Sequence, residues 1–150
     1  MKKAVLGILL AGIVLSLPVQ SEAHERQCPP TINVTQKEAQ ELLQIAWCEA
    51  GNQGIDGQLY VMSVIINRVN SPDFPDSVHD VIFQSGQFAT KGMSIAQPTS
   101  ETHYALAYLE AGNLTPEIIA FERTDSDALD VYFSEAFDYR DHTFYTAKID

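Results

Sequence analysis

The sequence predicts an α+β fold, in which a helical lobe is followed by a small antiparallel β-sheet. Residues 36–111 contain several segments whose apolar residues recur at helical spacing. After Pro116 the segments become short, aromatic and β-branched, which is typical of strands. Helices that come first and strands that come last indicate an α+β protein and not alternating βα units.

Residues 1–23 have the three parts of a secretory signal peptide. Two lysines near the start precede an apolar stretch that is short for a membrane span, and residues 21–23 (SEA) have the small-x-small pattern of a cleavage site. An uncleaved membrane anchor is the alternative. We therefore expect a secreted protein, free or wall-associated, with no stable membrane insertion after signal cleavage. An extended arm at residues 24–34 and one domain at residues 35–150 would follow.

Charge and cysteine content limit the partners of this chain. Its net charge of −11 at pH 7 argues against nucleic acid, because nucleic-acid-binding proteins carry basic patches. An anionic polymer would have to be held by local hydrogen bonds and stacking. The two cysteines, Cys28 and Cys48, either form a disulfide, worth about 3 kcal/mol in the chain-entropy model, or remain two thiols.

The first helix is predicted over residues 36–49. Thr35 and Glu38 have the spacing of a capping box at its start. Glu49 follows Leu42, a residue of the apolar stripe, by seven positions, and two helical turns bring it back to nearly the same face. Glu49 is therefore expected to point toward the interior side of the helix.

A second helix is predicted over residues 57–70, after a turn rich in Gly and Asn, with Asp56 as its cap. Apolar residues cover well over half of its circumference, so it is expected to be buried. Arg68 lies among these residues and is expected to pair with a carboxylate. The remaining narrow face is polar and either lines a cleft or forms an internal network. This face consists of Tyr60, Ser63 and Asn67.

The rest of the chain supplies shorter elements. We expect a short helix at residues 78–84, an irregular segment at 91–98, and a third substantial helix at 100–111. One side of this helix carries Tyr104, Ala107, Tyr108 and Ala111. Strands are expected within IIAFER, DVYFSEAF and HTFYTA, and alternation in the last of these puts His142 and Phe144 on one face and Tyr145 on the other.

Glu49 is the strongest candidate for catalysis. Desolvation on an apolar face and the partial negative charge at a helix C-terminus both raise the pKa of a carboxyl group. A carboxylic acid that is still protonated near neutral pH can protonate a leaving oxygen, as glycosidic cleavage requires. A solvated glutamate at a frayed helix end is the alternative. The loop at residues 84–90 (QSGQFAT) adds amides and a ring that suit sugar hydroxyls and sugar faces.

The sequence provides little for a metal ion or a cofactor, and we expect neither. The chain has four histidines: His24, His79, His103 and His142. No pair of them has H-x-x-x-H spacing, and neither C-x-x-C nor G-x-S-x-G occurs. The acidic runs at residues 125–130 and 138–141 are expected to be solvated faces beside strands.

Residues 47–69, WCEAGNQGIDGQLYVMSVIINRV, resemble the central motif of the SleB-type cell wall hydrolases, the spore-cortex-lytic enzyme family. That motif has a Glu-Ala pair, a glycine turn, a Gly-Gln pair, an apolar helix and Asn-Arg-Val. The central matches are Glu49-Ala50, Gly57-Gln58 and Asn67-Arg68-Val69. The weaker flanking matches, in the family's order, are Phe74-Pro75, Val81-Ile82, Gln84, Gln87-Phe88, His142, Phe144 and Tyr145.

The resemblance implies a lysozyme-like catalytic domain that cleaves peptidoglycan glycan strands between N-acetylmuramic acid and N-acetylglucosamine. Members of the family are understood to be lytic transglycosylases in which one glutamate acts as acid and then as base, a role that falls on Glu49. The muramic C6 hydroxyl would be the nucleophile and the product a 1,6-anhydro sugar. Wall targeting would depend on the cleft or on an unidentified partner. The implied substrate-binding residues are Gln58, Asn67, Gln87, Phe88, His142 and Tyr145.

The chain departs from the family pattern next to Glu49. The family usually has a second Glu four residues later, where this chain has Gln53, and often another Glu where it has Asp56. Two alternatives follow from these departures. One is a water-using muramidase with Asp56 as its second carboxylate, which must lie within about 10 Å of Glu49. The other is a non-catalytic peptidoglycan-binding module of the same fold.

Overall fold

A computed structural model describes residues 32–148 of the chain. The predicted signal peptide, most of the predicted arm and Cys28 lie outside the described residues, so the Cys28–Cys48 disulfide stays a prediction. Among the described residues, no helix has the length and apolar character needed to cross a membrane.

The first helix, α1 (Gln36–Ala50), begins at the predicted capping box. The backbone N–H of Glu38 donates to Oγ1 of Thr35 (3.3 Å), and Oε2 of Glu38 accepts from the backbone N–H of Thr35 (2.8 Å). These two bonds satisfy backbone donors that a helix start leaves without partners. The cap fixes where α1 begins, and Glu49 is the second-to-last residue of the helix.

The second helix, α2 (Gly54–Val69), begins three residues earlier than predicted. Gly54 has a positive φ of 73°, which lets the chain leave α1 and enter α2 with only residues 51–53 between them. Asp56 therefore lies in the first turn of α2 and does not cap it. The prediction of Asp56 as the cap was wrong.

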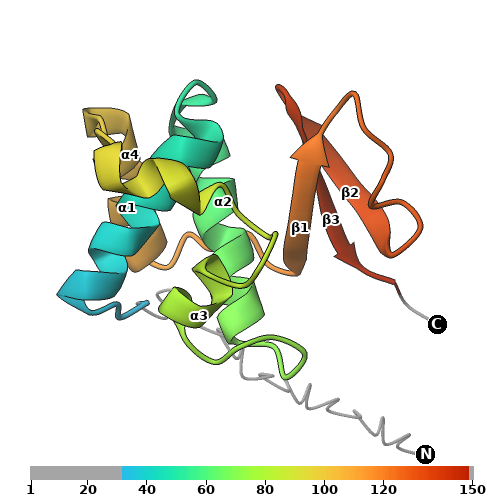
Figure 1. The fold of residues 1–150 in the computed structure, drawn as a ribbon, viewed down its shortest axis with the longest axis horizontal. Helices are drawn as coiled ribbons and strands as arrows, with labels where there is room; N and C mark the ends of the chain where they lie inside the picture. The colour runs from blue at the N-terminus through green and yellow to red at the C-terminus, as the bar shows by residue number, and fades with distance from the viewer. Residues whose placement is uncertain (1–31, 149–150) are drawn as a thin grey trace, which may run out of the picture.

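As predicted, α2 is buried, and apolar residues pack on two sides of it. One cluster joins it to the other helices, and a smaller one joins Val64 to Ile118 and Phe144 of the sheet. Figure 1 shows the other helices on one side of α2 and the three strands on the other. Because it packs on both sides, α2 connects the helical lobe to the sheet.

Three short elements follow α2. Helix α3 (Val78–Ile82) ends before the predicted residue 84. A 3-10 helix, η1 (Thr90–Ile95), lies in the segment predicted to be irregular, since one short turn has no apolar repeat to reveal it. Helix α4 (Ser100–Glu110) exposes its aromatic side, with Tyr104 60% exposed and Tyr108 49% exposed. The opposite side of α4, with Ala105, Leu106 and Leu109, packs into the core.

The sheet is antiparallel, as predicted, with strand order β1-β3-β2. Its strands are β1 (Ile118–Arg123), β2 (Phe133–Tyr139) and β3 (His142–Ala147). The central strand, β3, begins with His142, which pairs with Arg123 of β1 and Tyr139 of β2. A two-residue turn, Arg140-Asp141, joins β2 to β3. These pairings bring the end of β1 and the β2–β3 turn to the same end of the sheet.

Candidate active site

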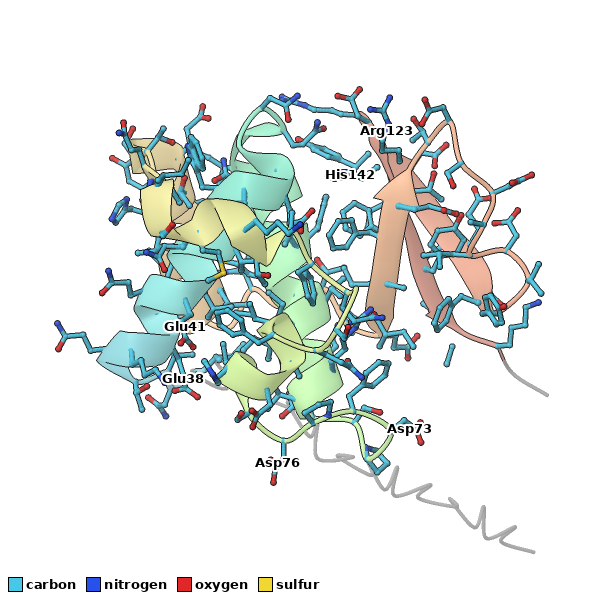
Figure 2. All side chains as sticks on the ribbon, in the orientation of Figure 1. Glu38, Glu41, Asp73, Asp76, Arg123 and His142 are labelled. Carbon is cyan, nitrogen blue, oxygen red and sulfur yellow. The ribbon has the colours of Figure 1, made fainter. Side chains whose placement is uncertain are left out.

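Glu49 lines a cavity of about 300 Å³ between the end of α1 and one end of the sheet, where β1 ends and β3 begins. The turn between α1 and α2, the end of β1 and the start of β3 supply the other side chains. Figure 2 shows Arg123 and His142 at the end of the sheet near the α1–α2 turn. The lining residues are Glu49, Asn52, Gln53, Arg123, Asp141 and His142.

The carboxyl group of Glu49 is half-buried and held by the backbone. Its Oε1 accepts a hydrogen bond of 2.5 Å from the backbone N–H of Ala89. Burial raises the pKa of Glu49 above its ordinary value of 4.5, and the Ala89 N–H offsets part of this effect. The sequence-based expectation of a raised pKa for this group is confirmed, with burial as the main cause.

His142 brings a neutral imidazole to the same cavity. Its side chain is 7% exposed and packs against Phe121 and Phe144. Burial lowers the pKa of His142, and the nearby Asp141 opposes part of this effect. Within residues 32–148 its Nδ1 is buried without a hydrogen-bond partner. The cavity thus contains a weak acid and a neutral imidazole with unused hydrogen-bonding capacity.

Gln53 connects the two turns that border the cavity. It is 2% exposed, and its Nε2 donates to Oδ1 of Asn52 (2.9 Å) and to Oδ2 of Asp141 (2.9 Å). Its Oε1 accepts from the backbone N–H of Asp141 (3.3 Å). Arg140 of the same turn donates to the carbonyl oxygen of Asn52 (3.2 Å). These contacts fix the β2–β3 turn against the α1–α2 turn, across 88 residues of sequence.

Two further cavities lie along the loop at residues 86–92. A cavity of about 540 Å³ is lined by Trp47, Phe88 and Ala89, and Ala89 is the residue that binds Glu49. A cavity of about 370 Å³ is lined by Gln87 and shares Gly86 with the second one. Gln87 and Phe88, both predicted site residues, line these two cavities and do not line the Glu49 cavity.

The other predicted substrate-binding residues line none of these three cavities. Gln58 is fully buried and donates to the carbonyl oxygen of Gly54 (3.1 Å). Asn67 donates to the carbonyl oxygens of Thr115 (2.9 Å) and Ile118 (2.8 Å). The Tyr145 hydroxyl, on the face of β3 opposite Phe144, lies 2.8 Å from Oε1 of Glu122 and 2.9 Å from Oδ1 of Asp130. In this structure these three side chains form hydrogen bonds within the protein, although Oε1 of Gln58 has no partner among residues 32–148.

The polar face of α2 is an internal network. Ser63 accepts from the backbone N–H of Thr115 (3.2 Å), next to the bonds made by Asn67. The Tyr60 ring packs edge-on against the rings of Phe137 and Phe144. Of the two alternatives for this face, the structure therefore contains the network that locks α2 to the sheet, and not a cleft.

Among residues 32–148, Arg68 does not pair with a carboxylate, contrary to prediction. Its side chain is 5% exposed, its Nε donates to the carbonyl oxygen of Ile119 (2.6 Å), and its Nη1 donates to Oε1 of Gln87 (3.0 Å). The guanidinium also lies over the rings of Phe74 and Phe88. Burial lowers the pKa of Arg68 to about 10. A backbone carbonyl, an amide and two rings replace the expected ion pair.

Four residues of the Glu49 cavity were not among the predicted site residues: Asn52, Gln53, Arg123 and Asp141. Asp141 was assigned to a solvated acidic run, and it is indeed exposed, yet it also lines the cavity. Its position directly before His142 was the only sequence signal that could have found it. Asp56 is exposed in the first turn of α2 and does not line this cavity. Within residues 32–148 no three His, Cys, Asp or Glu side chains are grouped as a metal site would require.

Comparison with known proteins places the chain among cell-wall-degrading proteins. Residues 52–145 match the family described as Cell Wall Hydrolase, so Glu49 precedes the matched range by three residues. The chain is 40% identical over 63 residues to the spore cortex-lytic enzyme of Oceanobacillus iheyensis, which is 39% of this chain and 23% of that protein. It is 37% identical over 67 residues to the spore cortex-lytic enzyme of Bacillus subtilis, 43% of this chain and 22% of that protein. The chain therefore matches less than a quarter of the length of these relatives.

Solved structures share its fold. The catalytic domain of the germination-specific lytic transglycosylase SleB from Bacillus anthracis superposes with a TM-score of 0.65 at 24% identity, over 76% of this chain and 98% of that one. The catalytic domain of the Bacillus cereus SleB protein gives the same TM-score and identity, over 82% of this chain and 99% of that one. The likeness confirms the predicted lysozyme-like α+β fold.

Proposed function

The chain belongs to the cell wall hydrolase family, and from this premise we propose that it cleaves peptidoglycan glycan strands between N-acetylmuramic acid and N-acetylglucosamine as a lytic transglycosylase. The observation that carries the proposal is the Glu49 carboxyl, half-buried with a raised pKa, at the wall of an open cavity. The solved relative from Bacillus anthracis is a lytic transglycosylase by its description, which supports the same chemistry.

One acid is sufficient for this reaction. The Ala89 N–H occupies Oε1 of Glu49, which leaves Oε2 for the substrate. Protonated Glu49 would give its proton to the glycosidic oxygen as the bond from that oxygen to muramic C1 breaks. The C6 hydroxyl oxygen would then attack C1 and pass its proton to the carboxylate, which restores Glu49 and forms the 1,6-anhydro ring. An ordinary glycoside hydrolase needs a second carboxylate to activate water or to attack the sugar.

Side chains near Glu49 could bind an uncharged part of the glycan. The neutral His142 imidazole can bond a sugar hydroxyl, and the rings of Trp47 and Phe88 in the cavity along residues 86–92 suit sugar faces. With a net charge of −11, the protein would hold the strand through such contacts and not by long-range attraction. We also propose that residues 1–23 export the protein to the wall, because the substrate lies outside the cytoplasm.

Mass spectrometry of digested peptidoglycan tests the proposal. Purified protein is expected to release muropeptides with 1,6-anhydro ends, compared with a parallel digest by a muramidase that leaves reducing ends. Reducing ends from this protein would reject the transglycosylase step and favour the use of water. Binding to peptidoglycan without any released product would reject the enzyme and favour the non-catalytic module.

The cleavage rate is expected to fall as the pH rises through the raised pKa of Glu49. A general acid acts in its protonated form, so the alkaline limb of the kcat/KM profile reports the pKa of that group in the free enzyme. Because burial raises this pKa above 4.5, the limb should lie above that pH. Initial rates on purified glycan strands at acidic, neutral and alkaline pH measure it. A His142→Asn variant should keep the limb whatever its absolute rate, whereas loss of the limb would assign it to the imidazole.

A further inference from the structure

Asp141 presents a second carboxylate to the cavity that Glu49 lines. Its Oδ2 accepts from Nε2 of the buried Gln53, and its backbone N–H donates to Oε1 of the same side chain, so the amide fixes the direction of the carboxylate. Its Oδ1 accepts no hydrogen bond from any residue between 32 and 148. One oxygen is thus anchored, and the other is available to a ligand.

Asp141 forms no salt bridge within the described part of the chain, although its charge acts on the nearby Arg123 and His142. Arg123, the cation of the cavity, bonds Asp125 at 2.9 Å and 3.0 Å, and Arg140 of the same turn donates to the carbonyl oxygen of Asn52. The other titratable groups that face Asp141 are Glu49 from α1 and His142 from β3. Asp141 thus brings a second carboxylate to the cavity that also contains the proposed general acid.

The residue that follows Asp141, His142, is a second polar side chain that lines this cavity. The His142 side chain is more than nine-tenths buried, and its Nδ1 has no partner among residues 32–148. Buried polar atoms are nearly always hydrogen-bonded, so this histidine, which lines the cavity, keeps bonding capacity that residues 32–148 do not use. Asp141 directly precedes this histidine.

We propose that Asp141 is a further catalytic residue, whose carboxylate stabilises the positive charge that develops on the muramic ring while Glu49 transfers its proton. The inference rests on the proposed function. As the bond between C1 and the glycosidic oxygen breaks, its electron pair leaves with the oxygen, and C1 and the ring oxygen share the positive charge. The Asp141 anion faces this charge without forming a bond or accepting a proton. The C6 hydroxyl oxygen then attacks C1, and its proton goes to Glu49.

The neutral amide of Gln53 explains how the cavity keeps this anion in place. A carboxylate at position 53 would lie within hydrogen-bond distance of the Asp141 carboxylate, and two like charges that close repel each other. The Gln53 amide instead donates to Asp141 and orients it. The second carboxylate of the site is therefore contributed by the β2–β3 turn, opposite the position at which the family pattern usually has a glutamate.

The test exchanges the charge between the two positions. Asp141→Asn removes the charge but keeps an oxygen that accepts from Gln53, and it should lower kcat about tenfold with little change in KM, because only the transition state carries the positive charge. Gln53→Glu alone should also lower kcat, since it sets two carboxylates against each other. The Gln53→Glu/Asp141→Asn double variant restores one carboxylate and one amide and should recover most of the lost kcat.

Thermal unfolding of all three variants distinguishes an effect of the lost charge on kcat from an effect on the stability of the fold. If Asp141 only braced the turn, Asp141→Asn would change the melting temperature and leave kcat of the folded enzyme at the wild-type value, which would overturn the proposal. Failure of the folded double variant to exceed the Asp141→Asn kcat would overturn it as well. A wild-type protein that releases no product would reject the proposed function itself. An active wild type with an equally active Asp141→Asn variant would reject only the role of Asp141.

Discussion

A Glu49→Gln variant is expected to lose cleavage activity by about a thousandfold while it stays folded, because general acid catalysis contributes on this order. The amide has the shape of the carboxyl, and its oxygen can still accept the Ala89 N–H. It has no acidic proton for the leaving oxygen and cannot act as the base in the second step. Release of anhydro-muropeptides, measured as an initial rate, is the direct readout.

The melting temperature of the Glu49→Gln variant shows whether its loss of activity comes from lost catalysis or from unfolding. The pKa of Glu49 is raised in the folded protein, so its favourable contribution to stability is present below the unfolded pKa and is lost as the pH rises through the folded pKa. At neutral pH the neutral amide should therefore leave the melting temperature unchanged or higher. Glu101→Gln, which changes an exposed glutamate in the first turn of α4, is the matched control and should keep full activity. Full activity in Glu49→Gln would contradict the assignment of Glu49.

An Arg68→Met variant is expected to lower the free energy of unfolding by about 3 kcal/mol, within the range for a broken buried polar network. Methionine keeps part of the apolar length of the side chain but has no N–H groups for the Ile119 carbonyl oxygen or for Gln87. It also removes the cation above the rings of Phe74 and Phe88. Arg68 thus joins α2 to β1 and to the loop at residues 86–88, and its loss loosens both contacts.

Urea unfolding followed by circular dichroism measures this effect. Arg140→Met is the matched control, because Arg140 is exposed and makes one hydrogen bond, to the carbonyl oxygen of Asn52. It should unfold near the wild-type midpoint. If Arg68→Met and Arg140→Met shifted the midpoint equally, the buried network around Arg68 would not be what stabilises the junction of helix and sheet.

The parts of the fold that depend on neighbouring residues were predictable from the sequence. The Thr35–Glu38 capping box acts over three residues, and it set the start of α1 correctly. The seven-residue spacing from Leu42 to Glu49 placed the acid on the inward side, and its raised pKa followed from that placement. The order of helices and strands gave the α+β class. The sequence could not reveal that Gly54 has a positive φ, and so the start of α2 was misplaced.

The parts of the site that depend on distant residues were decided by the tertiary structure. Gln53 and Asp141 are 88 residues apart, and only the packing of the β2–β3 turn against the α1–α2 turn brings their side chains together. Asn67 matches a family motif, yet its amide bonds carbonyl oxygens about fifty positions away, because a buried polar group must be satisfied wherever the fold supplies an acceptor. The sequence by itself determined which residue is the candidate acid and where its helix begins. The fold alone decided which groups surround that acid, since hydrogen bonds and charges act through space and not along the chain.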